Sequence, residues 1–436
     1  MSPSKSSPHT SPLFVGIDLG TSGCRAIAID EQARPVANLS LSWPAPEVHD
    51  RKIEQAPNIW WTHLQQLLSM LCEAISPDRV RAICLDGTSG TVLLADESGQ
   101  PLAPALMYND GRASTEAASL GDVAPGESAV HSPSSGLAKL LWLKQQPYAP
   151  QAKYFLHQAD WITGQLTGNF GISDFNNALK TGFDPLSRSW PDWLSSLGIP
   201  AGWLPKVVKP GTPVGTLRKD LADRFGFPEE TTIMAGTTDS TAAFLATGAS
   251  QPGEAVTSLG STLVVKMICE QPIFDSGSGV YSQACGDYWL AGGASNSGGK
   301  VLREYFTDEQ MQHMQEGLDI EHPTNLSYYP LPCTGERFPI NDPQMHPRLS
   351  PRPNDDVKFF QGLLEGIASI ELAGYKKLQQ LGAPWPVSIR SVGGGAKNDK
   401  WTKIRQSLLN VPMLDPIHTE AAYGVALLAK NSFDKI

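Results

Sequence analysis

The sequence predicts an α/β fold made of two related domains. Its 436 residues are enough for two or three domains of ordinary size. Early in the chain, three strand-like apolar segments precede an amphipathic helical pattern and a buried strand. These segments lie at 14–18, 25–30, 36–41, 59–75 and 80–85. Their order indicates a mixed sheet whose first strands are antiparallel and whose later strands pair through a crossover helix.

A second hairpin repeats the first one later in the chain. Asp18-Leu-Gly-Thr-Ser22 aligns with Ser258-Leu-Gly-Ser-Thr262, and each turn lies between two apolar segments. Such a repeat implies a duplicated domain that faces its copy across a cleft. Because the matching segment is short, chance similarity is the alternative.

The rest of the chain divides into a poorly patterned middle and a few clear elements. Residues 121–226 are rich in Trp, Pro, Gly and Ser without sustained alternation, so we interpret them as insertions on a core. The clear elements are a strand before a helix and a helix before a strand, at 231–235, 240–247, 360–378 and 387–392. We predict a disordered tail over 1–13, an N-terminal domain over 14–247 and a C-terminal domain over 248–436.

Charge and cysteine content narrow the partners and the location. The chain has 34 Lys and Arg against 44 Asp and Glu, a formal charge of −10, which disfavours nucleic acid as a partner. No segment approaches the roughly 18 consecutive apolar residues of a membrane span. The six cysteines have no metal-binding spacing, and the N-terminal segment lacks the apolar core of a signal peptide. We expect a cytoplasmic protein with reduced thiols and no membrane partner.

Three turns rich in glycine and hydroxyl side chains are candidates for binding phosphates, at 18–23, 258–262 and 393–398. In the first turn, backbone N–H groups and two hydroxyls accompany the Asp18 carboxylate, a set suited to phosphates with Mg²⁺. An ordinary tight hairpin is the alternative for this turn taken alone. The two further turns favour a nucleotide site that contacts all three.

Two familiar nucleotide motifs are missing from the sequence. Residues 294–301 resemble a P-loop, but Ala294 replaces the first glycine and Val301 stands where Mg²⁺ requires a hydroxyl. No G-x-G-x-x-G opens a βαβ unit with an acidic residue about 20 residues later, which disfavours a dinucleotide-dependent oxidoreductase.

Asp239 is the residue that we predict to act as general base. It follows a predicted strand and begins a predicted helix, where free N–H groups and the helix dipole stabilise a carboxylate. Phosphoryl transfer needs positioning, charge neutralisation and an acceptor for the hydroxyl proton, and one Asp is commonly enough. The alternative is that Asp239 only caps its helix.

Together with motifs elsewhere, these residues resemble the FGGY carbohydrate kinases. This group contains glycerol kinase, xylulokinase, gluconokinase and ribulokinase within the actin-like ATPase superfamily. Besides the first turn, the matching motifs lie at 137–143, 160–168, 173–184, 236–239, 335–343 and 393–398. The resemblance covers nearly the whole chain. It implies an α/β fold of two ribonuclease H-like (actin-like ATPase) domains around a central cleft, with the sugar deep in the cleft and ATP against the second domain.

The resemblance also implies roles for individual residues, with ATP as cosubstrate and Mg²⁺ as cofactor. Asp239 matches the catalytic base, and Asp18 and Asp239 are the expected metal ligands. Trp401 is available to cover the base of the nucleotide. The residues expected to bind ATP or its phosphates are Gly20, Thr21, Ser22, Arg25, Gly260, Ser261, Thr262, Gly298, Gly394, Gly395, Asn398 and Trp401.

Two loops, 86–91 and 108–112, are expected to select the sugar. The predicted sugar-binding residues are Ser89, Asp110 and Asp239. Typical xylulokinases carry a Gln-Met-His run in the first loop, where this chain reads Thr-Ser-Gly. This departure and the short chain resemble the compact plant and cyanobacterial sugar kinases that favour D-ribulose. The alternative for Ser89 is a tight turn chosen for backbone reasons.

The leading hypothesis is therefore ATP-dependent phosphorylation of D-ribulose to D-ribulose 5-phosphate. The same reaction on D-xylulose is the nearest alternative. A non-sugar actin-like ATPase that moves a partner protein and a sugar sensor that turns over poorly are alternatives from other classes. The acidic charge and the short second half predict a monomer or a weak homodimer.

Overall fold

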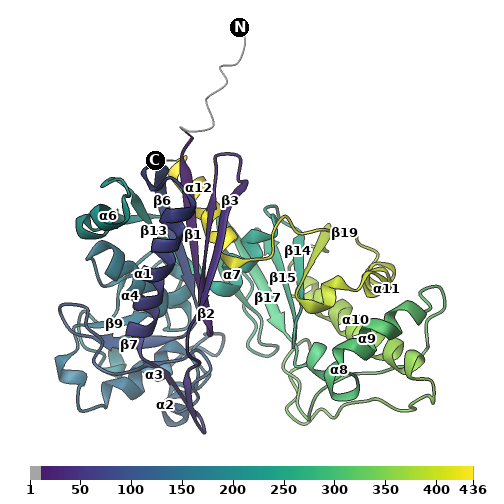
Figure 1. The fold of residues 1–436 in the computed structure, drawn as a ribbon. Coiled ribbons are helices and arrows are strands. Elements are labelled where there is room, and N and C mark those ends of the chain that lie inside the picture. The colour runs from purple at the N-terminus through teal and green to yellow at the C-terminus, as the bar shows by residue number, and fades with distance from the viewer. Residues whose placement is uncertain (1–10, 436) are drawn as a thin grey trace, which may run out of the picture. The chain divides into compact units, whose positions relative to one another are not determined.

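The computed structural model describes residues 11–435, and the chain forms two compact units. Unit 1 comprises Met1–Ala246 together with Glu420–Ile436, and unit 2 comprises Thr247–Thr419 (Figure 1). The division after Ala246 lies beside the predicted domain boundary. The end of the chain differs from the prediction, because it packs with unit 1 and not with the second domain.

Unit 1 is built on a six-stranded mixed sheet. Its strands have the order β12-β13-β6-β1-β2-β3, with bounds Pro213–Thr216, Thr232–Thr238, Val80–Gly87, Leu13–Leu19, Gly23–Ile29 and Pro35–Ser42. β1, β2 and β3 are antiparallel neighbours, whereas β6 and β13 run parallel to β1. The predicted hairpin, third strand and crossover are confirmed. All but the last three residues of the predicted tail lie outside the described residues, and Leu13 already belongs to β1.

Helices cover both faces of this sheet because successive strand side chains point to opposite sides. One core contains α1, α4 and α6 and the other contains α7 and α12, which span Pro57–Ala74, Gln158–Thr167, Lys219–Phe225, Asp239–Ala246 and Ala421–Phe433. Val15 and Ile17 of β1 face the first core, whereas Phe14 faces the second. The helices predicted over 59–75 and 240–247 are α1 and α7.

Helix α12 makes one close backbone approach to strand β1 and another to helix α7. A Cβ atom at Gly16 of β1 would overlap the carbonyl oxygen of Ala422, and one at Gly424 would overlap the carbonyl oxygen of Ala242 in α7. Glycine at these two positions therefore allows the backbones to touch. This packing places the end of the chain in unit 1.

The middle of the chain forms a second ordered layer of unit 1. A five-stranded sheet has the order β4-β5-β8-β7-β9, with bounds Glu47–His49, Lys52–Gln55, Ala105–Leu106, Val92–Ala95 and Tyr154–His157. The other elements are β10, β11, α2, α3 and α5, at Ile172–Asp174, Lys206–Val208, Ser114–Leu120, Gly136–Lys144 and Phe175–Leu179. From the region predicted as insertions, over 121–226, α3 and β9 share a core with the earlier elements β7 and α2. This region therefore contributes to a packed layer.

Unit 2 repeats the strand arrangement of unit 1. Its sheet has the order β16-β17-β15-β14-β18-β19, with bounds Tyr281–Cys285, Tyr288–Ala294, Leu263–Cys269, Glu254–Leu259, Ser388–Val392 and Met413–Leu414. In both units, three antiparallel strands are followed by two parallel ones, β6 and β13 or β18 and β19. The turns differ by one residue, because Asp18 pairs with Arg25 whereas Ser258 pairs with Val264. The predicted duplication is therefore present in the topology.

A buried ion pair joins the helices of unit 2 to its sheet. Helices α8, α9, α10 and α11 span Gly299–Tyr305, Asp308–Met314, Asp356–Gln380 and Asp399–Leu409. Arg405 of α11 donates from Nε and Nη2 to the two oxygens of Glu371 in α10, at 2.6 Å each, and both side chains are fully buried. Thr257 of β14 donates to the same carboxylate at 2.5 Å. The pair therefore links two helices to the central strand.

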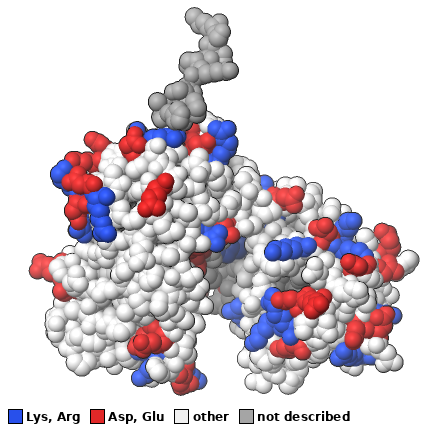
Figure 2. All heavy atoms as spheres, viewed as in Figure 1, with Lys and Arg blue, Asp and Glu red and all other residues white. Residues whose placement is uncertain are grey.

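None of the described helices is both long and apolar enough to cross a membrane. On the face shown in Figure 2, basic side chains of the described residues occur in small groups beside acidic ones. The predicted lack of a nucleic acid partner stays a prediction.

Candidate active site

Three Asp residues of unit 1 lie at the carboxyl ends of three parallel strands. Asp18 of β1 pairs in register with Asp86 of β6, which pairs in turn with Thr237 of β13. Asp239 follows β13 directly as the first residue of α7. The carboxyl ends of parallel strands are the usual location of ligand sites in α/β proteins. This edge of the sheet is therefore the candidate active site of unit 1.

The three carboxyl groups affect one another strongly. Burial raises the pKa of Asp86 well above its usual range, and Asp18 and Asp239 raise it further. Burial also raises the pKa of Asp18, although the charge of Arg25 acts in the opposite direction. Neither oxygen of the fully buried Asp86 receives a hydrogen bond from a described residue. The pair is therefore stable only with a shared proton or a cation between the two carboxyl groups.

Asp86 was predicted only as the first residue of the loop expected to select the sugar, and its position beside Asp18 was not predicted. Its buried carboxyl group, beside Asp18 and without a donor, fits a divalent cation. No group of three His, Cys, Asp or Glu side chains among residues 11–435 is placed to hold a metal ion by itself. Mg²⁺ is commonly held by one or two carboxylates together with water and substrate phosphates, so the pair fits Mg·ATP. The available signal was an Asp at the end of a buried strand, directly before a glycine.

Asp239 lies at the same sheet edge and is half-buried. Its Oδ1 accepts the N–H of Ser240 at 2.6 Å. The preceding residue, Thr238, pairs with Gly87, which follows Asp86 in β6. The predicted position at the start of a helix is confirmed. There, the helix N–H groups stabilise the ionised carboxylate.

The turn after β1 presents its hydroxyl groups on a fixed backbone. The N–H of Gly20 donates to the carbonyl oxygen of Gly23 at 2.9 Å. Trp43 donates from its backbone N–H to the Ser22 carbonyl and from Nε1 to the Thr21 carbonyl, at 3.0 Å each. These bonds use the carbonyl groups of the turn and leave the side chain of Ser22 exposed.

Arg25, predicted to contact phosphate, already has a partner in unit 1. It lies on β2 opposite Asp18, and its Nη1 is 2.8 Å from Glu420 Oε2. Both side chains of this ion pair are about one-third exposed. Exposed pairs of this kind are weak, so a phosphate can compete for the guanidinium.

The first loop predicted to select the sugar is firmly held at its base. The backbone N–H and Oγ1 of Thr88 both donate to Gln158 Oε1, at 3.0 and 2.9 Å. The N–H of Gln158 donates to the carbonyl of Thr91 at 3.0 Å. Ser89 lies at the tip and is half-buried, and Gly90 adopts a φ of +88°, which favours glycine. The turn geometry supports the backbone interpretation, and a role of Ser89 in sugar binding stays a prediction.

Asp110 contradicts its predicted role in sugar binding. Its carboxylate is fully buried and accepts the backbone N–H of Ile53 at 2.6 Å. It also accepts the backbone N–H, Nε and Nη2 of Arg112, at 2.7 to 3.1 Å. Arg112 itself donates to Glu54 at 2.5 Å and lies 4.9 Å from the ring centre of Trp142. Because its acceptor sites are used within the protein, Asp110 holds the loop and is not available to a ligand.

In unit 2, the turn after β14 lies in backbone contact with a second segment. The N–H of Gly299 donates to the carbonyl of Gly260 at 2.8 Å. A Cβ atom at Gly298, whose φ is +144°, would lie 2.7 Å from Thr262 Cα and 2.8 Å from the Ser261 carbonyl oxygen. Only glycine fits this close approach. Gly298 therefore lies against the turn with which it was grouped.

The glycine-rich segment after β18 packs against the same turn. A Cβ atom at Gly393, whose φ is +87°, would lie 2.9 Å from the carbonyl oxygen of Leu259. The next residue, Gly394, is exposed, and a Cβ atom there would meet nothing within 4 Å. The two predicted turns of unit 2, at 258–262 and 393–398, thus lie in contact, and the segment at Gly298 meets the first of them.

Trp401 contradicts its predicted role of covering a base. The side chain is 2% exposed, and its Nε1 donates to the carbonyl of Leu364 at 3.0 Å. A Cβ atom at Gly395 would lie 2.5 Å from the indole ring. Trp401 therefore supports the glycine segment from within the core. Asn398 accepts the N–H of Trp401 at 3.0 Å and caps α11, which leaves the amide nitrogen of Asn398 as its donor.

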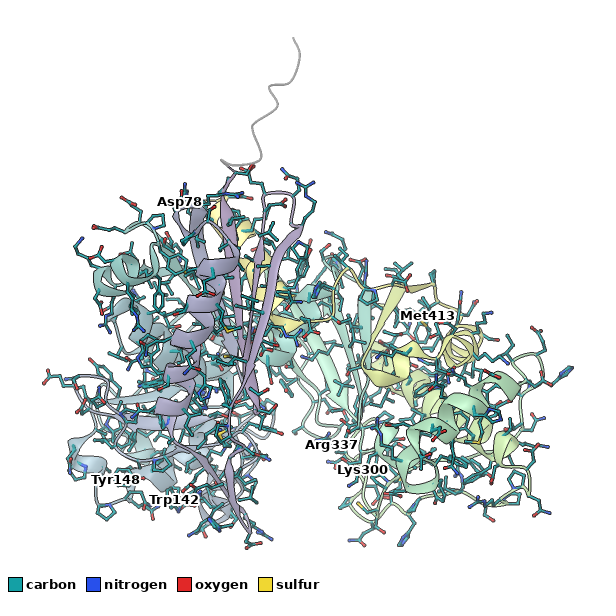
Figure 3. All side chains as sticks on the ribbon, viewed as in Figure 1. Asp78, Trp142, Tyr148, Lys300, Arg337 and Met413 are labelled. Carbon is teal, nitrogen blue, oxygen red and sulfur yellow. The ribbon has the colours of Figure 1, made fainter. Side chains whose placement is uncertain are left out.

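A buried carboxylate fixes the segment that leads into Gly298. Glu336 accepts Ser295 Oγ at 2.5 Å and the N–H of Asn296 at 2.7 Å. This contact connects the motif at 335–343 to the phosphate turn. Two exposed basic residues lie nearby in the sequence: Arg337 directly follows Glu336, and Lys300 lies shortly after Asn296 (Figure 3).

Two family models together match nearly the whole chain. The N-terminal domain of the FGGY family of carbohydrate kinases matches residues 13–246, and the C-terminal domain matches residues 255–432. The chain therefore belongs to the FGGY family, and the protein is a carbohydrate kinase. The predicted family is confirmed.

Similar proteins are named as kinases of several sugars. A xylulose kinase of Staphylococcus epidermidis is 25% identical over 96% of this chain and 87% of its own length. A gluconokinase of Bacillus subtilis is 22% identical over 97% of this chain and 88% of its own. The structure titled a xyloylose kinase from Brucella ovis has a TM-score of 0.88 and 26% identity, covering 97% of this chain and 91% of that one. Plasmodium falciparum glycerol kinase with ADP shares the fold, with a TM-score of 0.86 and 17% identity over 99% and 91% of the two chains. The predicted class of two ribonuclease H-like domains is confirmed.

Proposed function

We propose that the protein transfers the γ-phosphate of ATP to a hydroxyl group of a free ketose, with D-xylulose as the first candidate. The observation that carries this proposal is the row of Asp18, Asp86 and Asp239 at one edge of the unit 1 sheet. In a carbohydrate kinase, such a row supplies both a general base and ligands for Mg·ATP.

Asp239 acts as the general base in this proposal. It accepts the proton of the sugar hydroxyl while the hydroxyl oxygen bonds to the γ-phosphorus and the bond to ADP breaks. It is partly accessible at the start of α7, where its carboxylate can reach a ligand. Asp18 and Asp86 are less suited to this role, because burial raises the pKa of both groups.

Asp18 and Asp86 would hold Mg²⁺ together with the ATP phosphates. The cation would supply neutralisation of charge on the transferring phosphoryl group. The expectation that Asp239 is a metal ligand is the alternative, in which Asp239 would help to hold the same cation.

The nucleotide is bound mainly by backbone N–H and hydroxyl groups of the turns. These residues are Gly20, Thr21 and Ser22 in unit 1, and Gly260, Ser261, Thr262, Gly298, Gly394, Gly395 and Asn398 in unit 2. The exposed Gly394, where a Cβ atom would meet nothing within 4 Å, supports this assignment, because a glycine lets a ligand approach the backbone closely. Arg25 joins the set when it exchanges Glu420 for a phosphate.

Two ketoses, D-xylulose and D-ribulose, are candidates for the sugar substrate. Relatives named xylulose kinase support D-xylulose, the alternative in the sequence analysis, better than D-ribulose, its first choice. D-Ribulose is the second candidate because the chain reads Thr88-Ser89-Gly90 where typical xylulokinases carry Gln-Met-His. The two ketoses differ in configuration at one carbon, so a single loop is enough to discriminate between them.

ADP release from Mg·ATP tests the proposal with D-xylulose, D-ribulose, gluconate, glycerol and a blank without sugar. We expect the highest kcat/KM with D-xylulose and a lower value with D-ribulose, and the reverse order identifies the second candidate. A rate increase with gluconate or glycerol alone overturns the ketose assignment. Equal hydrolysis in every sample favours a partner-driven ATPase, and sugar binding without turnover favours a sensor.

The location and the oligomeric state stay predictions. All six cysteines, which lie within the described residues, are free, as a reducing cytoplasm requires. A monomer or weak homodimer is tested by sedimentation over a range of protein concentrations.

A further inference from the structure

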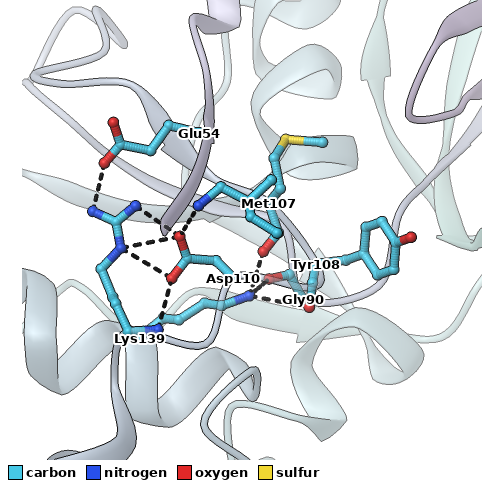
Figure 4. Close-up of polar contacts among 8 residues, drawn as sticks. Glu54, Gly90, Met107, Tyr108, Asp110 and Lys139 are labelled. Carbon is cyan, nitrogen blue, oxygen red and sulfur yellow. Dashed lines mark hydrogen bonds and ion pairs between the residues drawn. The ribbon is translucent and has the colours of Figure 1, made fainter. Parts of the chain in front are cut away.

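Lys139 makes three contacts inside unit 1 that the reaction chemistry does not use. It lies on α3, is fully buried, and donates from Nζ to the carbonyl oxygens of Gly90 at 2.8 Å, Met107 at 2.6 Å and Tyr108 at 3.3 Å (Figure 4). An ammonium group has three N–H donors and no acceptor, so three carbonyl groups match its full capacity. Burial lowers the pKa of Lys139 to about 7. Burying a charged lysine here lowers the stability of the fold, so packing alone does not explain its presence.

The three carbonyl groups belong to the two loops that the sequence predicts to select the sugar. Gly90 follows Ser89 at the tip of the first loop, over 86–91. Tyr108 begins the second loop, over 108–112, and Met107 directly precedes it. Tyr108 itself is 42% exposed. Lys139 therefore lies behind backbone positions whose neighbouring side chains can reach a ligand.

Each loop also has an anchor of its own. Gln158 holds the first loop through Thr88, at 2.9 and 3.0 Å. Asp110 holds the second loop by accepting donors from Ile53 and Arg112 (Figure 4). These anchors attach each loop to its own surroundings, whereas Lys139 hydrogen-bonds to both loops. The strand pair of Val92 with Leu106 joins the loops at their bases, and Lys139 adds a link closer to their tips.

We propose that Lys139 is a positioning residue for sugar recognition, which holds the loop carrying Ser89 in register with the loop carrying Tyr108 and Asn109. The inference rests on the proposed function, because it takes these two loops to be the ones that contact the ketose. A sugar is selected by several hydroxyl groups at once. Its protein partners must therefore keep their relative positions within a fraction of an ångström.

The main test compares Lys139→Met with Lys144→Met. Lys144 lies on the same helix and donates to the carbonyl of Leu197 at 2.8 Å, away from both loops, so it is the matched control. We expect Lys139→Met to raise the KM for the ketose by about tenfold or more and to reduce discrimination between D-xylulose and D-ribulose. The KM for ATP should change by less than about twofold, because the nucleotide turns do not touch Lys139. Equal ketose KM values in the two variants overturn the inference.

Two further measurements test the inference even if Lys139→Met does not fold. Lys139→Gln keeps two N–H donors, and we expect a ketose KM between those of the wild type and Lys139→Met. Hydrogen exchange of the peptides over 86–91 and 105–112 should be faster in both Lys139 variants than in Lys144→Met. Unchanged exchange in both loops overturns the anchoring role. Faster exchange in a protein whose wild type phosphorylates no ketose instead overturns the proposed function and leaves Lys139 as the link between the loops.

Discussion

In the proposed reaction, the carboxylate of Asp239 is the acceptor of the sugar hydroxyl proton. Replacing it in Asp239→Asn removes the acceptor for the hydroxyl proton and preserves the shape of the side chain. We expect kcat to fall by about 100-fold or more, while ketose affinity measured by calorimetry changes little. Asp308→Asn is the control, because Asp308 also begins a helix, α9, but is exposed. A variant that retains full kcat would remove Asp239 from the mechanism.

His157 is a buried residue whose effect is expected on stability. It is 1% exposed, and its Nε2 lies 3.1 Å from Thr181 Oγ1. Burial, with the charges of Lys139 and Lys180, lowers the pKa of His157 from 6.5 to about 3. Between these pH values the unfolded chain binds a proton that the folded chain does not, so the free energy of unfolding decreases as the pH falls below about 6.5.

His157→Asn should therefore show a weaker loss of stability in acid. The stability difference between variant and wild type is expected to change by on the order of 3 kcal/mol between pH 6.5 and pH 4. Urea unfolding at several pH values measures this change, because other titrating groups are common to both proteins. His313→Asn, at an exposed position, is the control. Parallel curves for wild type and His157→Asn would show that His157 takes up its proton equally in both states.

At the scale of elements, the pair between Arg405 and Glu371 holds α10 and α11 to the sheet of unit 2. Arg405→Met leaves the Glu371 carboxylate buried without its cation, so we expect a loss of about 3–5 kcal/mol in the unfolding of unit 2. The double variant Glu371→Gln with Arg405→Met should recover much of this loss, because no buried charge remains. Chemical denaturation measures both effects. Equal losses in the single and double variants would attribute the effect to packing alone.

The elements also show where local sequence patterns are sufficient. The hairpins β1–β2 and β14–β15 and the helices α1 and α10 follow from apolar spacing and turn composition, which are properties of neighbouring residues. Residues 121–226 have irregular spacing because α3 and β9 share a core with β7 and α2, which lie earlier in the chain, so no single segment carries the pattern. Their order therefore emerges only when these elements pack together.

At the scale of the whole molecule, the C-terminal helix α12 packs into unit 1, which the N-terminal half of the chain forms. A truncation after Thr419 removes α12 and exposes the core side chains of Phe14, Met234 and Ala242. We expect this variant to lose the cooperative unfolding of unit 1, as measured by calorimetry, because apolar burial drives folding. A truncation after Phe433, which keeps α12, should unfold like the full chain. Unchanged unfolding after Thr419 would show that α12 adds little to the core.

The family, the duplicated strand order and the three glycine-rich turns could be predicted from the sequence, which also supplied Asp239 as the candidate base. Turn composition, spacing and motifs are written in neighbouring residues, so they are accessible without coordinates. Tertiary structure alone decided that Asp86 lies beside Asp18, that Asp110 and Trp401 are buried, and that α12 returns to unit 1. Each of these facts depends on strand register or on close contact between residues far apart in the chain. Burial and pairing of this kind are collective properties of the packed fold, and they decide which chemically suitable side chains are available to a ligand.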